Sequence, residues 1–229
     1  MFPLRVGVQA VTALKSQSRL RYANCFHGVI RQQQQLLKVR NMSNTFLKAL
    51  GDELVELEEE GIMEKIDVES ILAESPFDLK STDGARVVLK NGNALVSFNA
   101  AEFEHSGGSE SAVPMIVTLE HETSQSQLSL ACIARNNDEG DEEEGELEIE
   151  HVVVEPLGGN KNVDKPEPYS PAIGELNDEM KTSIFEYLHS KGVDNDFASC
   201  VVNIASKREE QLYGEWLMDV KSFVEKEDA

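Results

Sequence analysis

Three consecutive stretches decide the fold: residues 113–121 read VPMIVTLEH, residues 127–135 read QLSLACIAR and residues 147–156 read LEIEHVVVEP. Each is rich in β-branched residues or alternates apolar with polar positions, as strands with one buried face do. The segments ETSQS and NNDEGDEEEG, which separate them, are rich in turn-forming residues and too short for a crossover helix. The sequence therefore predicts neighbouring antiparallel strands.

Three earlier runs extend this pattern towards the N-terminus: FDLKS (77–81), ARVVLK (85–90) and ALVSFNAAEF (94–103). The turn signals TDG and NGN separate them, and again no helix-length segment intervenes. A seventh short strand is expected near residues 167–171 (EPYSP), where the prolines restrict it to a sheet edge. The middle of the chain is thus predicted to be an antiparallel meander in an α+β fold.

Helical spacing flanks this meander on both sides. On the N-terminal side, residues 43–61 begin with a capping residue, Ser43 or Asn44, and end at Gly61. Within them, leucines at 47, 50, 54 and 57 are spaced 3-4-3, which predicts an apolar seam.

Towards the C-terminus, residues 176–188 carry an apolar residue at every fourth position, and Gly192 closes that helix. Asp194 or Asn195 is expected to cap the next helical segment. The last segment repeats the 3-4-3 spacing, so we expect the first and last helices to pack together. Its apolar positions are Tyr213, Trp216, Val220 and Phe223.

The C-terminal motifs resemble a known family. Residues 192–195 (GVDN), the Phe197-Ala198 pair and the segment from Trp216 to the KSFV sequence at 221–224 are similar to the mitochondrial acidic matrix protein family, also described as the mitochondrial glycoprotein or complement globular-head-binding protein family. The resemblance implies a seven-stranded twisted antiparallel sheet flanked by one N-terminal and two C-terminal helices. It also implies a ring-shaped homotrimer with an acidic face. The chain departs from some relatives in having only a short loop, EHSGGSES, where they carry a longer acidic one.

Charge divides the chain into two parts. The net charge is −21, yet the first 51 residues hold eight basic and no acidic residues, while residues 52–229 hold 13 basic and 42 acidic residues. An acid-free, Arg- and Ser-containing N-terminus with apolar residues near helical spacing is typical of a mitochondrial transit peptide. We therefore expect a transit peptide or disordered basic segment at residues 1–42 and a single acidic domain at residues 43–229, with cleavage near residues 40–46. A disordered basic tail that binds anions is the alternative.

The most acidic run, residues 138–150, reads DEGDEEEGELEIE and allows three interpretations. It is a cation site, a solvated loop, or a surface for a basic partner. An EF-hand is excluded, because Gly140 and Glu143 occupy positions where that motif needs an oxygen ligand and a glycine. The residues expected to bind a basic partner are Asp138, Glu139, Asp141, Glu142, Glu143, Glu144 and Glu146, with Glu53, Glu56 and Glu60 on the leucine-rich helix.

Catalytic signatures are absent from the sequence. It contains no P-loop, no GxGxxG after a strand, no HExxH and no GxSxG. His121 and His151 each adjoin a glutamate, but neighbouring residues of a strand point to opposite faces, so neither pair forms a local dyad. His189 is expected to serve the last carbonyls of its helix. We therefore expect no catalytic residues, no metal and no cofactor.

The other notable side chains have ordinary structural explanations. Cys132 and Cys200 have apolar neighbours and are interpreted as buried small hydrophobic residues rather than a disulfide. Trp216 is expected in the core or in a subunit interface. No stretch of about 18 apolar residues occurs, so no membrane span is predicted.

The predicted function follows from the charge. A strongly acidic domain repels nucleic acids and anionic lipids and attracts Lys/Arg-rich proteins. The resemblance implies a non-catalytic adaptor or chaperone-like protein of the mitochondrial matrix, whose partners are basic RNA-binding or ribosomal proteins. It would support mitochondrial RNA metabolism, in translation, RNA processing or editing. The alternative is a metal-dependent enzyme or a divalent-cation-buffering protein that uses the acidic clusters.

Overall fold

The computed structural model describes residues 42, 44–106, 110–137, 144–157 and 168–227. The predicted transit peptide therefore lies almost entirely outside the described residues. The chain forms two compact units, each described separately below: Met1–Glu56 with Leu217–Ala229, and Leu57–Trp216.

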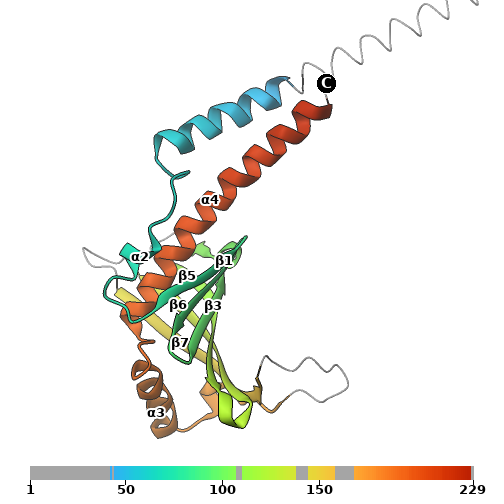
Figure 1. Cartoon of the computed structure of the whole chain (residues 1–229). Coiled ribbons are helices and arrows are strands. Elements are labelled where there is room, and N and C mark those ends of the chain that lie inside the picture. Colours follow the sequence, from blue (N-terminus) through green and yellow to red (C-terminus); the bar gives the residue numbers. More distant parts are fainter. Residues whose placement is uncertain (1–41, 43, 107–109, 138–143, 158–167, 228–229) are drawn as a thin grey trace, which may run out of the picture. The chain divides into compact units, whose positions relative to one another are not determined.

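A seven-stranded antiparallel sheet dominates the unit Leu57–Trp216 (Figure 1). The strand order is β1-β2-β3-β5-β6-β7, and β4 pairs with β5 beside this path. The strands are β1 (Asp78–Asp83), β2 (Arg86–Asn91), β3 (Ala94–Asn99), β4 (Glu104–Ser106), β5 (Glu110–His121), β6 (Ser126–Asn137) and β7 (Glu144–Pro156). Because the strands of this path follow one another in chain order and all pairs are antiparallel, the predicted α+β meander is confirmed.

The seventh strand does not lie where the sequence predicted it. Residues 168–171 form no strand, and Ala172 makes only an isolated bridge to His151. The prolines at 168 and 171 have no N–H to give to a ladder, so pairing stops there. The seventh strand is instead β4, which the short helix η1 (Ala100–Glu102) separates from β3.

This interruption explains a proline in the middle of the sheet. Pro114 lies inside β5, which pairs with β6 along its whole length. On the other side of β5, the pairing with β3 ends at Met115 and the pairing with β4 starts at Ala112, which lies opposite Glu104. Pro114 therefore lies opposite the gap between β3 and β4. A proline, which has no N–H to donate, is tolerated there because no strand pairs with it on that side.

Besides η1, the helices that begin in this unit are α2 (Val68–Ile71), η2 (Glu122–Ser124), η3 (Ile173–Glu175), α3 (Asp178–His189) and α4 (Asn195–Glu227), whose last part, from Leu217, belongs to the other unit. Residues of α2, α3 and α4 pack in the core with the sheet. Gly192, with φ +81°, follows α3 as predicted, and Asp194 caps α4 by accepting a hydrogen bond from the N–H of Phe197 at 2.9 Å. The last two predicted helical segments form one continuous helix, α4.

The core lies between the first half of α4 and the inner face of the sheet. Alternate residues of β2, β3, β5 and β6 are buried there against α4, as the period-two pattern predicts. The rings of Phe77 and Phe197 pack with their centroids 4.5 Å apart. Fully buried members of this core include Leu89, Val96, Val117, Leu130, Val201 and Ile204.

The predicted seam of the N-terminal helix is confirmed. The helix covers residues 44–59, and Gly61, with φ +75°, follows its end. Leu50 and Leu57 are buried, and the other two leucines of the seam are half-buried. Asn44 is not the cap, because residue 42 is already helical; Ser43 lies outside the described residues.

The expected apolar positions of α4 are offset by one residue from the buried ones. Gly214 and Leu217 are buried, whereas Trp216 is 55% exposed and Phe223 is 62% exposed. The absence of a side chain at Gly214 admits Met63, which a Cβ atom there would strike. Trp216 is therefore not a core residue of the single chain, which corrects one of the two expectations for it. The aromatic residues that marked the spacing lie beside the buried stripe.

Candidate functional site

The structure describes only some of the predicted acidic site residues. Asp138, Glu139, Asp141, Glu142 and Glu143 lie outside the described residues, and of Glu144 only the backbone, at the start of β7, is described. Glu56 is exposed and Glu53 half-buried in one compact unit, while Glu60 and Glu146 are exposed in the other. Most of the predicted acidic run is therefore outside the part of the chain that the structure describes.

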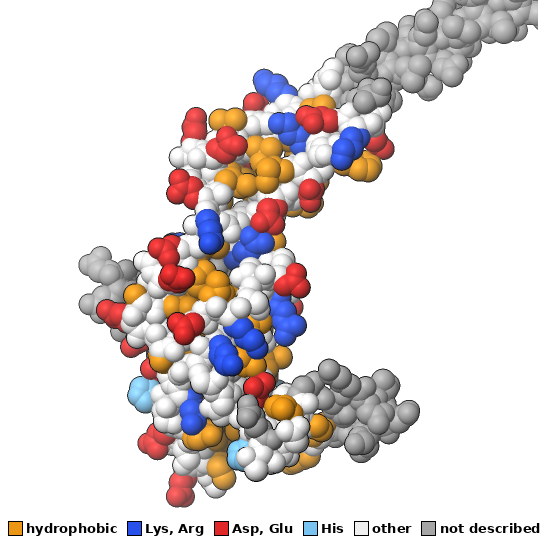
Figure 2. Space-filling view, viewed as in Figure 1, with side chains coloured by type: hydrophobic (Ala, Val, Ile, Leu, Met, Phe, Trp, Pro, Cys, Tyr) orange, Lys and Arg blue, Asp and Glu red, His pale blue; other side chains and the backbone are white. Residues whose placement is uncertain are grey.

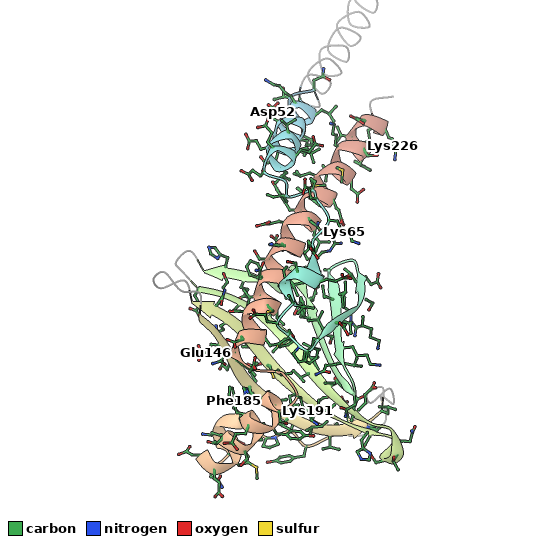
Figure 3. All side chains as sticks on the ribbon, turned by 60° about the vertical axis from the view of Figure 1, so that its left-hand side comes forward. Asp52, Lys65, Glu146, Phe185, Lys191 and Lys226 are labelled. Carbon is green, nitrogen blue, oxygen red and sulfur yellow. The ribbon has the colours of Figure 1, made fainter. Side chains whose placement is uncertain are left out.

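Strand β7 continues the acidic run on the sheet. Glu146, Glu148 and Glu150 are all exposed, and Figure 3 shows Glu146 at the margin of the sheet. The ladder between β6 and β7 shifts at Ala131 and Cys132, so Glu150 has no residue directly opposite it. Of these three glutamates only Glu146 was predicted as a binding residue, although the alternation in ELEIE indicates that the others also face outward.

Arg135 neutralises part of this acidic strand. Its guanidinium donates to Glu148 Oε2 at 3.1 and 3.0 Å and to Glu110 Oε1 at 2.9 Å. The hydrogen bond to Glu148 is the main reason why the pKa of Arg135 is raised. Among the described residues, Glu146 and Glu150 have no ion-pair partner. Figure 2 shows acidic side chains spread over the viewed face and interspersed with Lys and Arg, not gathered at one point.

The first turn of α4 fixes the base of the β6–β7 hairpin. The Asn195 side chain accepts a hydrogen bond from the N–H of Leu147 at 3.1 Å, and Ser199 Oγ donates to Asn136 Oδ1 at 2.7 Å. Gly145 permits this contact, since a Cβ there would strike the Asn195 carbonyl oxygen and Ser199. The strands that lead into and out of residues 138–143 are thus held by one helix end.

The structure places the three histidines that the sequence singled out, and one of them differs from its prediction. His121 and His151 are exposed strand residues, as predicted, and Ser124 donates its backbone N–H to His121 Nδ1 at 3.2 Å. His189 differs from the prediction: its Nδ1 lies 3.4 Å from Asp194 Oδ2. The turn between α3 and α4 directs it to the carboxylate that caps α4 instead of to the end of its own helix.

The two described cysteines, Cys132 and Cys200, form no disulfide and are poorly suited to nucleophilic chemistry. Burial raises the pKa of the Cys132 thiol to about 12, with a smaller contribution from Glu150. Burial is also the main reason why the pKa of Cys200 is raised, and its Sγ lies 3.4 Å from the Ile71 carbonyl oxygen. Neutral thiols are weak nucleophiles and weak metal ligands. Within the described ranges, no three His, Cys, Asp or Glu residues form a group that would hold a metal ion.

The outer face of the sheet, which is the face turned away from α4, is hollowed. One hollow of about 530 Å³ is lined by residues from Lys80 of β1 to Glu155 of β7. A second, of about 550 Å³, adjoins it and shares Asp83, Arg86, Ser97 and Ile116 with it. Sequence reasoning missed these hollows, because strand patterns show which residues face outward but not how far the sheet curls.

The fold and surface define a class of protein: an α+β protein with a seven-stranded antiparallel meander, flanking helices and a strong excess of acidic residues. The sequence model of the family described as mitochondrial glycoprotein (MAM33) matches residues 51–224, so the chain belongs to this family. This membership indicates a mitochondrial protein.

Other comparisons add a structural likeness. A solved structure of a hypothetical Leishmania major protein of unknown function, described as a sequence homologue of human p32 protein, is 16% identical. The match covers 80% of this chain and 98% of that chain, with a TM-score of 0.49. No curated protein matches the sequence. No helix of the described part is long and apolar enough to cross a membrane.

Proposed function

We propose that the protein is a non-catalytic acidic adaptor or chaperone-like protein of the mitochondrial matrix that binds basic proteins. The observation that carries this proposal is the charge of residues 52–229, which hold 42 acidic and only 13 basic residues. Ion pairs between described residues involve Glu110, Glu148, Asp178, Asp194 and Glu215, and 13 basic residues are too few to pair with 42 acidic ones. Most of the negative charge is therefore free to attract a cationic partner.

The same charge selects the class of partner. Nucleic acids are bound mainly by cationic side chains that displace counterions, and this domain carries few. Lys/Arg-rich proteins are attracted instead, with association accelerated by the summed field. In a mitochondrial matrix such proteins are chiefly ribosomal and RNA-binding ones, so the adaptor would support RNA metabolism, in translation, RNA processing or editing.

Self-association as a homotrimer is part of this proposal. In the unit Leu57–Trp216, the rings of Tyr213 and Trp216 stack with centroids 6.0 Å apart and remain partly exposed. In the other unit, Phe46, Val55 and Phe223 are exposed on its helices. Burial of large exposed apolar side chains by a second copy is favourable. A closed symmetric oligomer buries them without forming an open-ended filament.

A salt-controlled capture experiment tests the proposed function. The purified chain, immobilised, is exposed to matrix extract at about 50 mM and about 500 mM salt, which screens charges beyond a few ångströms. We expect Lys/Arg-rich RNA-binding or ribosomal proteins to be retained at low salt and released at high salt. Retention of neutral or acidic proteins, or retention independent of salt, would contradict an electrostatic adaptor.

A further inference from the structure

The outer face of the sheet is curled into a groove. Strands β1 and β7 lie at opposite edges of the six-strand path, about 24 Å apart in a flat sheet at the usual strand spacing. Nevertheless Lys80 of β1 and Glu155 of β7 line the same hollow. The sheet must therefore curl towards its outer face, and the two adjoining hollows form one continuous groove, which we call the outer groove.

The floor of the outer groove is apolar in the middle. Val88, Ser97 and Ile116 lie side by side on β2, β3 and β5, and Leu95 lies one row further along β3. Val88 and Leu95 are half-buried, and Ile116 is 51% exposed although β5 has a pairing strand on each side. A hollow with an accessible aliphatic floor favours burial of an apolar side chain from a ligand.

One end of the outer groove carries two carboxylates. The ladder places Glu120, Gln127 and Glu155 next to one another on β5, β6 and β7. Gln127 Nε2 and Ser129 Oγ donate to Glu155 Oε1 at 2.9 and 2.7 Å, so this carboxylate is held in position. Both glutamates are half-buried, and neither has an ion-pair partner among the described residues.

The charges around the outer groove are mostly negative. Among its described lining residues, the basic ones are Lys80 and Arg86, on the first two strands. The acidic lining residues are Asp83, Glu102, Glu120, Glu150 and Glu155. Partly buried carboxylates without a counterion favour a ligand that brings a cation to them, because the desolvated charge is then compensated.

We propose that the outer groove is the docking site for one segment of a basic partner protein, in which a Lys or Arg lies close to an aliphatic residue. The aliphatic side chain packs on Ile116, Leu95 and Val88, and the cationic group lies between Glu120 and Glu155. This proposal rests on the proposed function and specifies where and how such a partner binds. A second copy of this acidic domain fits less well, because it would bring mostly like charge to the groove.

A peptide probe with matched variants tests the groove. The probe is a fluorescent peptide that contains leucines and arginines, and its comparator has serine at each leucine. In Glu120→Gln/Glu155→Gln, we expect affinity for the leucine peptide to fall about tenfold, the usual effect of losing a charge-assisted contact. The control Glu179→Gln/Glu186→Gln changes two exposed carboxylates of α3, so the net charge changes equally. It should alter affinity less than about twofold.

A second pair of variants tests the apolar floor. Ile116→Ser should weaken the leucine peptide several-fold and leave the serine peptide unchanged, since only the former buries a side chain there. Its control is Val154→Ser, an exposed aliphatic residue of β7 outside the groove. Thermal melts accompany each variant; if Ile116→Ser does not fold, the glutamine variants still decide.

The outcomes distinguish a failure of the outer-groove proposal from a failure of the proposed acidic-adaptor function. Equal weakening in the groove and control variants would overturn the groove and leave the acidic adaptor intact. If the unmodified chain binds neither the peptide nor any basic protein at low salt, the proposed function fails as well. If Glu120→Gln/Glu155→Gln changes the oligomeric state by sedimentation without any peptide, a second copy occupies the groove and the proposal is wrong.

Discussion

At the residue scale, glycines serve this fold in two ways: by adopting positive φ and by leaving space where a side chain would clash. Gly61 and Gly192 were identified as helix ends from local pattern, and both adopt positive φ there. Gly145 carries no such local signal. A glycine is needed at position 145 because Asn195 and Ser199, about fifty residues further along the chain, approach its backbone closely. Contacts of this kind depend on tertiary packing and were therefore not predictable.

Gly145→Ala tests this close approach. The added methyl group would meet backbone as well as side-chain atoms of α4, so helix and hairpin must separate. We expect the free energy of unfolding in urea to fall by about 1–3 kcal/mol. The control is Gly174→Ala, where a Cβ has open space around it and the effect should be small. Equal stability of the two variants would show that α4 does not clamp the hairpin.

Cys132 should be inert in the folded protein. Because burial raises its pKa to about 12, the neutral thiol predominates at physiological pH, and its Sγ is shielded from reagents. The unfolded chain releases this proton from about pH 9, whereas the folded protein releases it only near pH 12, so folding stability should fall as the pH rises from 9 towards 12.

Alkylation followed by mass spectrometry checks the prediction for Cys132. At pH 8 we expect the peptide containing Cys132 to be modified only after denaturation, and the half-buried Cys200 to react sooner. Rapid modification of Cys132 in the native protein would mean that this part of the sheet opens readily.

At the element scale, the sequence predicted long elements well and short ones poorly. Strands β5, β6 and β7 have enough alternating residues to be recognised, and all three were predicted. Strand β4 has three residues, too few for a period, and was missed. In α4 the apolar spacing was recognised, but the buried face is one residue further on, at Gly214 and Leu217. Large aromatic residues mark the spacing of a helix without fixing which of its faces is covered.

Asp194→Ala tests the start of α4. The substitution removes the acceptor for the Phe197 N–H and the partner of His189. We expect a loss of about 1 kcal/mol in the free energy of unfolding, the usual effect of deleting a helix cap. Asp194→Asn keeps an acceptor oxygen at the same place and should retain most of the stability. If the two variants are equally destabilised, the charge near the helix end matters more than the cap.

At the scale of the whole molecule, the sequence predicted the acidic charge but did not predict the outer groove. The excess of acidic residues follows from counting, and it supports the proposed partner class. The outer groove requires the curl of the sheet, which brings residues of β1 and β7 to the same hollow. Because this curl depends on packing across six strands, no local sequence pattern predicted Glu120 or Glu155 as binding residues.

Trp216→Ala tests the proposed homotrimer. Because the indole is about half exposed in the single chain, the substitution should change the stability of one subunit by less than about 1 kcal/mol. It should weaken self-association about tenfold or more if a second subunit covers the ring. Sedimentation over a range of concentrations measures this effect, with Tyr169→Ala, an exposed ring elsewhere, as the control. An unmodified chain that is monomeric at micromolar concentration would refute the trimer.

The acidic adaptor is tested most directly by the rate of association between the purified protein and an Arg/Lys-rich RNA-binding protein, followed by stopped flow as salt is raised. We predict that the rate falls steeply up to about 150 mM salt, where the Debye length is about 8 Å. In the variant with Asp141→Asn, Glu142→Gln, Glu143→Gln and Glu144→Gln, association should be slower and thermal stability equal or slightly higher, because self-repulsion decreases. An association rate that changes neither with salt nor in this variant would contradict the claim that acidic charge recruits the partner.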